Sequence, residues 1–151
     1  DLHSFPTRRS SDLYSSDKNA PLRSEINAGT DLTREVQNAD GWNVESENVE
    51  TPDLDNVFTG KIPGKTSAED SSLAFYASED GVDARQVLPR LTPGFLMIFD
   101  GGDVPGRKMR VFPVRVSSVG MPIDVEGSDA AVVNIAFAIT SAPAENVSVP
   151  A

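Results

Sequence analysis

The fold of this 151-residue chain is decided by the stretch Val132-Val-Asn-Ile-Ala-Phe-Ala-Ile-Thr140. Large apolar side chains stand at every second position, at Val133, Ile135, Phe137 and Ile139, and small or polar side chains stand between them. Successive side chains of a β-strand point to opposite faces, so this alternation is typical of a strand with one buried face. The stretch therefore predicts a β-strand that turns one face toward a core.

Other segments also carry strand patterns. The five consecutive apolar residues Phe95–Phe99 predict a strand that is buried on both faces, or buried on one face and covered by a neighbouring chain on the other. Shorter patterns predict strands over 73–77 and over 109–119. In the latter, Pro113 suggests a position at the edge of a sheet, because proline cannot donate a ladder hydrogen bond.

Alternation over 32–47 predicts two strands joined by a hairpin turn at Asp40-Gly41. A short helix over 32–38 is an alternative, but the Asp-Gly pair fits the hairpin better. The segment 80–88 is predicted to be a helix that Pro89 ends.

Strands in hairpin order with one short flanking helix predict a mainly β fold, an antiparallel β-sandwich or barrel-like domain over 31–142. Within it, the Pro- and Gly-rich segment 51–67 predicts a long loop. We expect residues 14–30 to form an extended N-terminal arm, which could include one short strand near Ile26. We expect residues 143–151 to form a C-terminal tail that docks on the domain.

The first residues differ in character from the rest. The run His3–Leu13 resembles the translation of a common short-read sequencing adapter, so residues 1–13 are predicted to be a non-native segment. A Ser- and Arg-rich flexible tail is the alternative. Removing residues 1–13 takes away two Arg and two Asp, so 13 basic and 23 acidic residues become 11 and 21, and the net charge stays at −10.

Composition excludes several function classes. The chain has no Cys and one His, so thiol nucleophiles, disulfides and cysteine-ligated metal sites are excluded. Its net charge of −10 is opposite to the clustered positive charge that binds nucleic-acid phosphates. There is no run of about 18 apolar residues that would span a bilayer. The composition predicts neither an enzyme nor a resident cofactor, and no contact with a membrane.

Two segments match binding motifs only in part. Gly60–Thr66 has three residues between its glycines where a phosphate-binding loop has four, so nucleotide binding is not predicted. Asp53, Asp55 and Asn56 have the spacing of part of a calcium loop, and the turn 100–103 carries two aspartates. Turn formation explains such aspartates more simply, and no metal site is assigned.

A cluster of glutamates follows the predicted hairpin turn. Glu45, Glu47 and Glu50 lie in or beside a predicted strand. Paired carboxylates serve glycoside hydrolysis, but the one aromatic residue nearby is Trp42, so a solvated polar face is the simpler interpretation.

Further strings carry a family resemblance, in the order in which they occur. They are Glu25-Ile-Asn-Ala-Gly-Thr-Asp-Leu32, Gly41-Trp-Asn-Val-Glu-Ser-Glu47, Glu50-Thr-Pro-Asp-Leu54, Lys61-Ile-Pro-Gly-Lys-Thr-Ser-Ala-Glu-Asp-Ser-Ser72, Phe75-Tyr-Ala-Ser78, Val87-Leu-Pro-Arg90, Asp100-Gly-Gly-Asp-Val-Pro-Gly106, Val111-Phe-Pro-Val114 and Pro143-Ala-Glu-Asn-Val-Ser-Val-Pro-Ala151. Over these strings the chain resembles the major tail protein, or tail tube protein, of long-tailed actinobacterial phages. None of the strings is a catalytic motif.

The resemblance implies an antiparallel β-sandwich or barrel-like subunit with one helix. Such subunits form hexameric rings that stack into a hollow tube, through which DNA passes without specific binding. It also implies other tail proteins as partners, such as the tape measure and the tail terminator, and a place in the virion after assembly in the host cytoplasm. A stand-alone acidic β-sandwich for binding or adhesion, or a related secretion-type tube protein, is the alternative.

The resemblance also suggests where the contacts between rings lie. It places the segment 51–67 there, with Asp53, Asp55, Lys61 and Lys65 as candidate residues, and it has the terminal arms help to stack the rings. An acidic channel wall would repel DNA phosphates, and the cluster Glu45, Glu47 and Glu50 is the candidate for that wall.

Overall fold

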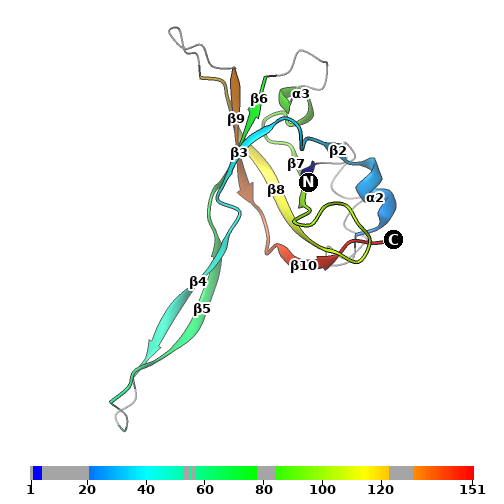
Figure 1. Cartoon of the computed structure of the whole chain (residues 1–151). Helices are drawn as coiled ribbons and strands as arrows, with labels where there is room; N and C mark the ends of the chain where they lie inside the picture. Colours follow the sequence, from blue (N-terminus) through cyan, green and yellow to red (C-terminus); the bar gives the residue numbers. More distant parts are fainter. Residues whose placement is uncertain (1, 5–20, 53–54, 56, 78–83, 123–130) are drawn as a thin grey trace.

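The computed structural model of this chain describes residues 2–4, 21–52, 55, 57–77, 84–122 and 131–151 (Figure 1). The strands are β1 (Leu2–Ser4), β2 (Thr30–Asp31), β3 (Val36–Asp40), β4 (Val44–Thr51), β5 (Gly60–Ala68), β6 (Ser71–Tyr76), β7 (Pro93–Ile98), β8 (Lys108–Gly120), β9 (Val132–Ile139) and β10 (Ala144–Ser148). The helices are α2 (Arg23–Ala28) and α3 (Ala84–Val87).

Eight of these strands form one antiparallel sheet, in the order β2-β1-β7-β8-β9-β6-β3, with β10 paired beside β8. The sheet curls into a half-barrel, and β4 and β5 form a separate two-stranded ribbon that projects from it (Figure 1). The predicted mainly β, antiparallel and barrel-like fold is confirmed. The described residues contain two short helices, whereas the sequence predicted one.

The central strand β8 supplies side chains to cores on both faces of the sheet. Its register with β7 pairs Leu96 with Phe112 on one face and Met97 with Val111 on the other. The buried residues of the first core are Leu32, Trp42, Leu73, Phe75, Ala84, Leu88, Leu96, Phe112, Val114, Val116, Val133, Ile135 and Phe137. Those of the second core are Ile26, Phe95, Met97, Phe99, Met109, Val111, Ala144, Val147 and Val149.

These two cores confirm the predictions for the main strands. The alternate residues of β9 enter the first core, as the pattern over Val132–Thr140 predicted. The run Phe95–Phe99 sends residues to both cores, which explains why it contains no polar position.

The segments at both ends of the chain cover the second core. The expected extended arm is wrong for Arg23–Ala28, which form α2 and bury Ile26. The Leu22 amide donates to Glu25 Oε2 at 2.8 Å and starts the helix. The expected C-terminal tail docks as β10, which pairs with β8 and buries Val147.

Pro113 does not mark a sheet edge, because β8 is paired with β7 on one side and with β9 and β10 on the other. The amide and carbonyl of one residue in an antiparallel strand point to the same side. The Pro113 carbonyl accepts from the Thr140 amide at 3.0 Å, where the chain leaves β9. The proline nitrogen therefore faces the break between β9 and β10, where no ladder partner is needed.

Asp40-Gly41 does not join a hairpin either, since β3 pairs with β6 and β4 pairs with β5. The helix considered over 32–38 is also absent, because Val36–Asp40 is a strand. Gly41 has φ +82° and Trp42 has φ +60°, and together they turn the chain from the sheet into the ribbon. The buried Trp42 indole decides this path, because it packs edge-on against Phe112 with ring centroids 5.2 Å apart.

A Gly41→Ala variant is expected to lose at least about 2 kcal/mol of unfolding free energy. A Cβ at Gly41 would lie 2.9 Å from the Asp70 carbonyl oxygen and 2.9 Å from the Ser71 Cα, in addition to the strain of the positive φ. Gly106→Ala is the matched control, because Gly106 has φ +84° and a Cβ there would meet nothing within 4 Å. Urea denaturation measures both, and equal losses would contradict the steric argument.

The predicted helix over 80–88 is observed over Ala84–Val87, and residues 78–83 lie outside the described residues. Ala84 and Leu88 are buried in the first core. In the described part of the chain, no helix has the length and apolar character needed to cross a membrane.

Candidate functional site

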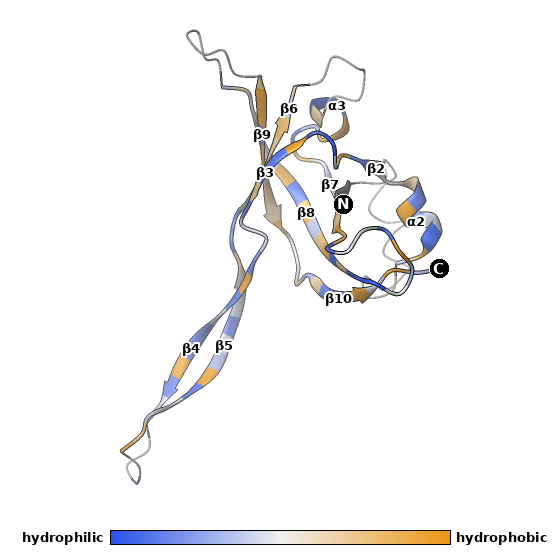
Figure 2. Ribbon diagram, in the orientation of Figure 1, coloured by the Kyte–Doolittle hydropathy of each residue, from blue (hydrophilic) through white to orange (hydrophobic). Residues whose placement is uncertain are grey.

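The most distinctive surface of the molecule is the ribbon formed by β4 and β5 (Figure 2). Among the described residues these two strands form a sheet of their own, and all of their residues are exposed except Val44, Gly60 and Ala68, which are half-buried. The expected long loop over 51–67 is therefore wrong for residues 60–67, which belong to β5.

The sequence predicted a strand where β4 begins, but it missed β5 and so missed the ribbon. No residue of β5 is buried, so no alternation of apolar and polar residues marks this strand. Pro63 and Gly64 also resemble loop punctuation, yet both lie within β5 next to an irregularity in its register with β4. A Cβ on Gly64 would lie 2.9 Å from the backbone carbonyl oxygen of Glu47 and 2.8 Å from Val49 Cγ2, so the close approach of the two strands favours glycine there.

The three predicted glutamates all lie on β4 but not on one face. Alternation along the strand places Glu45 and Glu47 on one face of the ribbon and Glu50 on the other. Glu50 is paired in register with Lys61, whose Nζ lies 3.5 Å from Glu50 Oε1. Both side chains are more than half exposed, so this ion pair contributes little to stability.

Of the other predicted residues, Asp55 and Lys61 lie near the far end of the ribbon, whereas Lys65 lies nearer the end that joins the main sheet. Asp55 lies in the turn between the strands and is exposed, and Lys61 and Lys65 are exposed on β5. Asp53 lies outside the described residues. The structure therefore brings Asp55 and the two lysines onto one projecting element.

Sequence reasoning missed the apolar residues of the ribbon. Val49 and Ile62 are paired across the two strands and are 49% and 52% exposed. In the connection between the strands, which we call the tip, Val57 and Phe58 are 106% and 77% exposed. The sequence does contain large apolar residues within this polar segment. Isolated apolar residues are common on protein surfaces, and they indicate a binding surface only when the fold brings them together.

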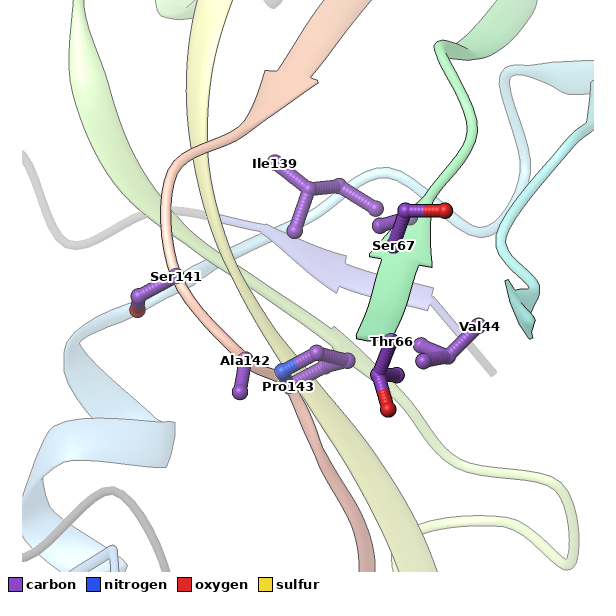
Figure 3. A pocket seen from close by; sticks show the side chains of 8 residues that line it. Val44, Thr66, Ser67, Ile139, Ser141, Ala142 and Pro143 are labelled. Atoms are coloured by element: carbon purple, nitrogen blue, oxygen red, sulfur yellow. The ribbon is translucent and has the colours of Figure 1, made fainter. Parts of the chain in front are cut away.

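A pocket of about 240 Å³ lies at the other end of the ribbon, which we call the root (Figure 3). It is lined from the ribbon by Val44, Thr66, Ser67 and Ala68, and from the end of β9 and the link to β10 by Ile139, Ser141, Ala142 and Pro143. None of these eight residues is charged.

The main sheet has an open face of small side chains. The strand registers align Ser118, Ala136, Ser72 and Asp40 in one row across β8, β9, β6 and β3. Ser118 and Asp40 are exposed, and the two residues between them are half-buried. This row carries a single charge, that of Asp40, and no bulky group.

The aspartates of the turn after β7 have structural partners. Asp100 accepts from Arg110, with 2.7 Å between Oδ1 and Nη2, and Asp103 pairs with Arg23 of α2. The described residues contain no group of three or more metal-binding side chains. Asp53 and Asn56 of the partial calcium pattern lie outside these residues.

Comparison with solved structures finds the same fold in tubular assemblies. The sheath/tube terminator of an extracellular contractile injection system (PVC, extended state) is 14% identical, with a TM-score of 0.55 over 72% of this chain and 83% of that one. The PVC sheath-tube complex gives 16% identity and a TM-score of 0.51, over 68% of this chain and 74% of that one. The tube-terminating cap of the anti-feeding prophage is 17% identical, with a TM-score of 0.52 over 78% of each chain.

Comparison with curated proteins finds no match. A family model described as "Phage tail tube protein" matches residues 12–151, which include the whole ribbon, both cores and β10. The chain therefore belongs to the phage tail tube protein family and is a structural, non-enzymatic component of the phage tail.

Proposed function

We propose that this chain forms hexameric rings that stack into the tail tube and that DNA passes through the tube without specific binding. The exposed ribbon carries the proposal. A two-stranded hairpin is marginally stable alone, and this one presents the cross-strand pair Val49 and Ile62 to solvent. A neighbouring subunit that covers the ribbon around Val49 and Ile62 would remove this apolar pair from water.

Electron microscopy and analytical ultracentrifugation of the purified chain test this proposal. Rings with six-fold symmetry, and tubes built from them, are the expected result. A folded monomer that persists at high concentration would contradict ring formation and favour a stand-alone binding module.

We further propose that acidic side chains line the channel. The net charge is −10, and a ring multiplies each inward-facing carboxylate by the number of subunits. Glu45 and Glu47 share a face of the ribbon and form no ion pair with any cation among the described residues, whereas Lys61 offsets the charge of Glu50. The wall is therefore assigned first to Glu45 and Glu47, with Glu50 as the weaker member.

Replacing Glu45 and Glu47 with Lys is expected to slow DNA ejection while tubes still form, because each lysine would attract phosphates. The measurement is the ejection rate of phage that carry the variant gene, at two salt concentrations. The matched control is Glu145→Lys, which changes an exposed carboxylate on β10. Equal ejection rates for the wild type and the double variant would overturn the assignment.

The remaining proposals concern assembly and origin. Asp53, Asp55, Lys61 and Lys65 are proposed to contact the next ring, and the tape measure and tail terminator proteins are proposed as further partners. The chain is assigned to the long-tailed actinobacterial phage type, assembled in the host cytoplasm.

Residues 1–13 are proposed to be adapter-derived, which agrees with the start of the family match at residue 12, although β1 pairs with β7. Sequencing the gene from phage DNA tests this origin.

A further inference from the structure

We propose that the apolar tip of the ribbon, Val57 and Phe58, inserts into the pocket at the root of the ribbon of a neighbouring copy. This inference rests on the proposed assembly into rings and tubes and names one contact that would hold it together. It concerns two surfaces at opposite ends of one element: an exposed apolar pair and an uncharged pocket.

The chemistry of the two surfaces matches. The tip presents a valine and a phenylalanine that are 106% and 77% exposed. The pocket offers the apolar side chains of Val44, Ile139 and Pro143, with hydroxyl groups beside them (Figure 3). It has no charged lining residue, so insertion of the Phe58 side chain would desolvate no charged group. Burial of apolar side chains in such a site is favourable, and the absence of a charged lining residue avoids the cost of burying an unpaired ion.

The pocket is also held in place before any partner arrives. Ile139 packs against the first core, so one wall is continuous with the interior. The link that follows is fixed by Thr140, whose amide and hydroxyl both donate to the Pro113 carbonyl, at 3.0 and 3.3 Å. A preformed pocket requires little ordering on binding, which favours its use as a docking site.

The occupant must come from another copy. The eight residues of β4 separate the root from the tip, and at about 3.3 Å per residue they span roughly 25 Å. The ribbon projects away from the sheet, so the tip and the pocket of one chain lie far apart (Figure 1). The tip of one chain therefore cannot fill the pocket of the same chain.

Such a contact has the symmetry that a ring or tube requires. Each copy carries one tip and one pocket at different places on its surface, so the contact can repeat head-to-tail from copy to copy. Head-to-tail contacts close into rings or continue as helical filaments.

Cross-linking tests the pairing, and the natural absence of cysteine makes every introduced thiol unique. One preparation carries Val57→Cys, which leaves the Phe58 ring in place, and a second carries Ala142→Cys, an exposed residue of the pocket wall. The two are mixed, assembled and treated with a short bismaleimide. The control mixture replaces Ala142→Cys with Val104→Cys, a 44% exposed residue in the turn after β7.

The expected result is a covalent dimer of Val57→Cys with Ala142→Cys at a yield at least tenfold above that of the control mixture. Tubes that form without this excess would overturn the pairing and leave the proposed function intact. Failure to form any ring or tube under all conditions would overturn both, so the two failures are distinguishable.

A second variant separates docking from folding. Phe58→Ser is expected to prevent or strongly weaken assembly without a change in melting temperature, because the side chain is mostly exposed in the single chain. Val104→Ser, the matched exposed position, is expected to assemble as the wild type does. Normal tubes from Phe58→Ser would overturn the inference.

Discussion

A Phe112→Ala variant is expected to lose about 3 to 5 kcal/mol of unfolding free energy. Phe112 is 0% exposed, lies on the central strand β8 and pairs in register with Leu96 of β7. Its ring also contacts the Trp42 ring at a centroid distance of 5.2 Å. Truncation to alanine would remove this packing and leave a cavity in the middle of the first core.

The size of this loss decides whether the variant folds. Single domains have a total stability of about 5 to 15 kcal/mol, so the loss would remove a large share of it and would leave a domain at the low end of this range unfolded. Urea denaturation followed by circular dichroism measures the loss. Phe58→Ala is the matched control, because the same change at a 77% exposed position is expected to cost less than about 0.5 kcal/mol. Similar losses in the two variants would contradict the placement of Phe112 in the core.

Deleting the ribbon is expected to abolish assembly and to leave the main sheet folded. The variant replaces residues 45–67 with a short Gly-Ser link, so that Val44 and Ala68, which are paired in register, stay adjacent. In the described part of the chain, β4 and β5 pair only with each other, and neither supplies a residue to the two buried cores. The sheet therefore loses no ladder and no core contact.

The readouts for this variant are the melting temperature and the oligomeric state. We expect a monomer whose melting temperature lies within a few degrees of that of the wild type, and no rings by electron microscopy. Rings from the shortened chain would contradict the role of the ribbon in assembly. A variant that fails to fold would contradict its structural independence from the sheet.

Local pattern was sufficient wherever a strand has a buried face. The alternation at Val133, Ile135, Phe137 and Ile139 predicts a strand whatever its partners are, because burial on one side imposes a period of two. The apolar run Phe95–Phe99 is equally informative, since both of its faces are covered. The family resemblance extended these local observations to a tube protein, which the family match confirmed.

Prediction failed where the deciding forces are long-range. Asp40-Gly41 has hairpin chemistry, but burial of Trp42 in the first core sends the chain into the ribbon instead. Residues 23–28 contain few apolar side chains, so their sequence gives no helical pattern. They form a helix that buries Ile26 in the second core, where its side chain leaves water. In both cases a contact with distant residues outweighs a weak local preference.

The candidate site shows the same division. The sequence alone determined the acidity, the absence of thiol chemistry and the strands whose side chains are buried, because composition and alternation are properties of the chain itself. Only the tertiary structure decided that β4 and β5 form a projecting ribbon, that Pro113 sits in a central strand, and that an apolar tip and an uncharged pocket stand at opposite ends of one element. The physical reason is that an exposed ribbon buries almost nothing within its own chain, so its sequence carries no alternation of buried and exposed residues. The role of its apolar residues can therefore be inferred only from where the fold places them.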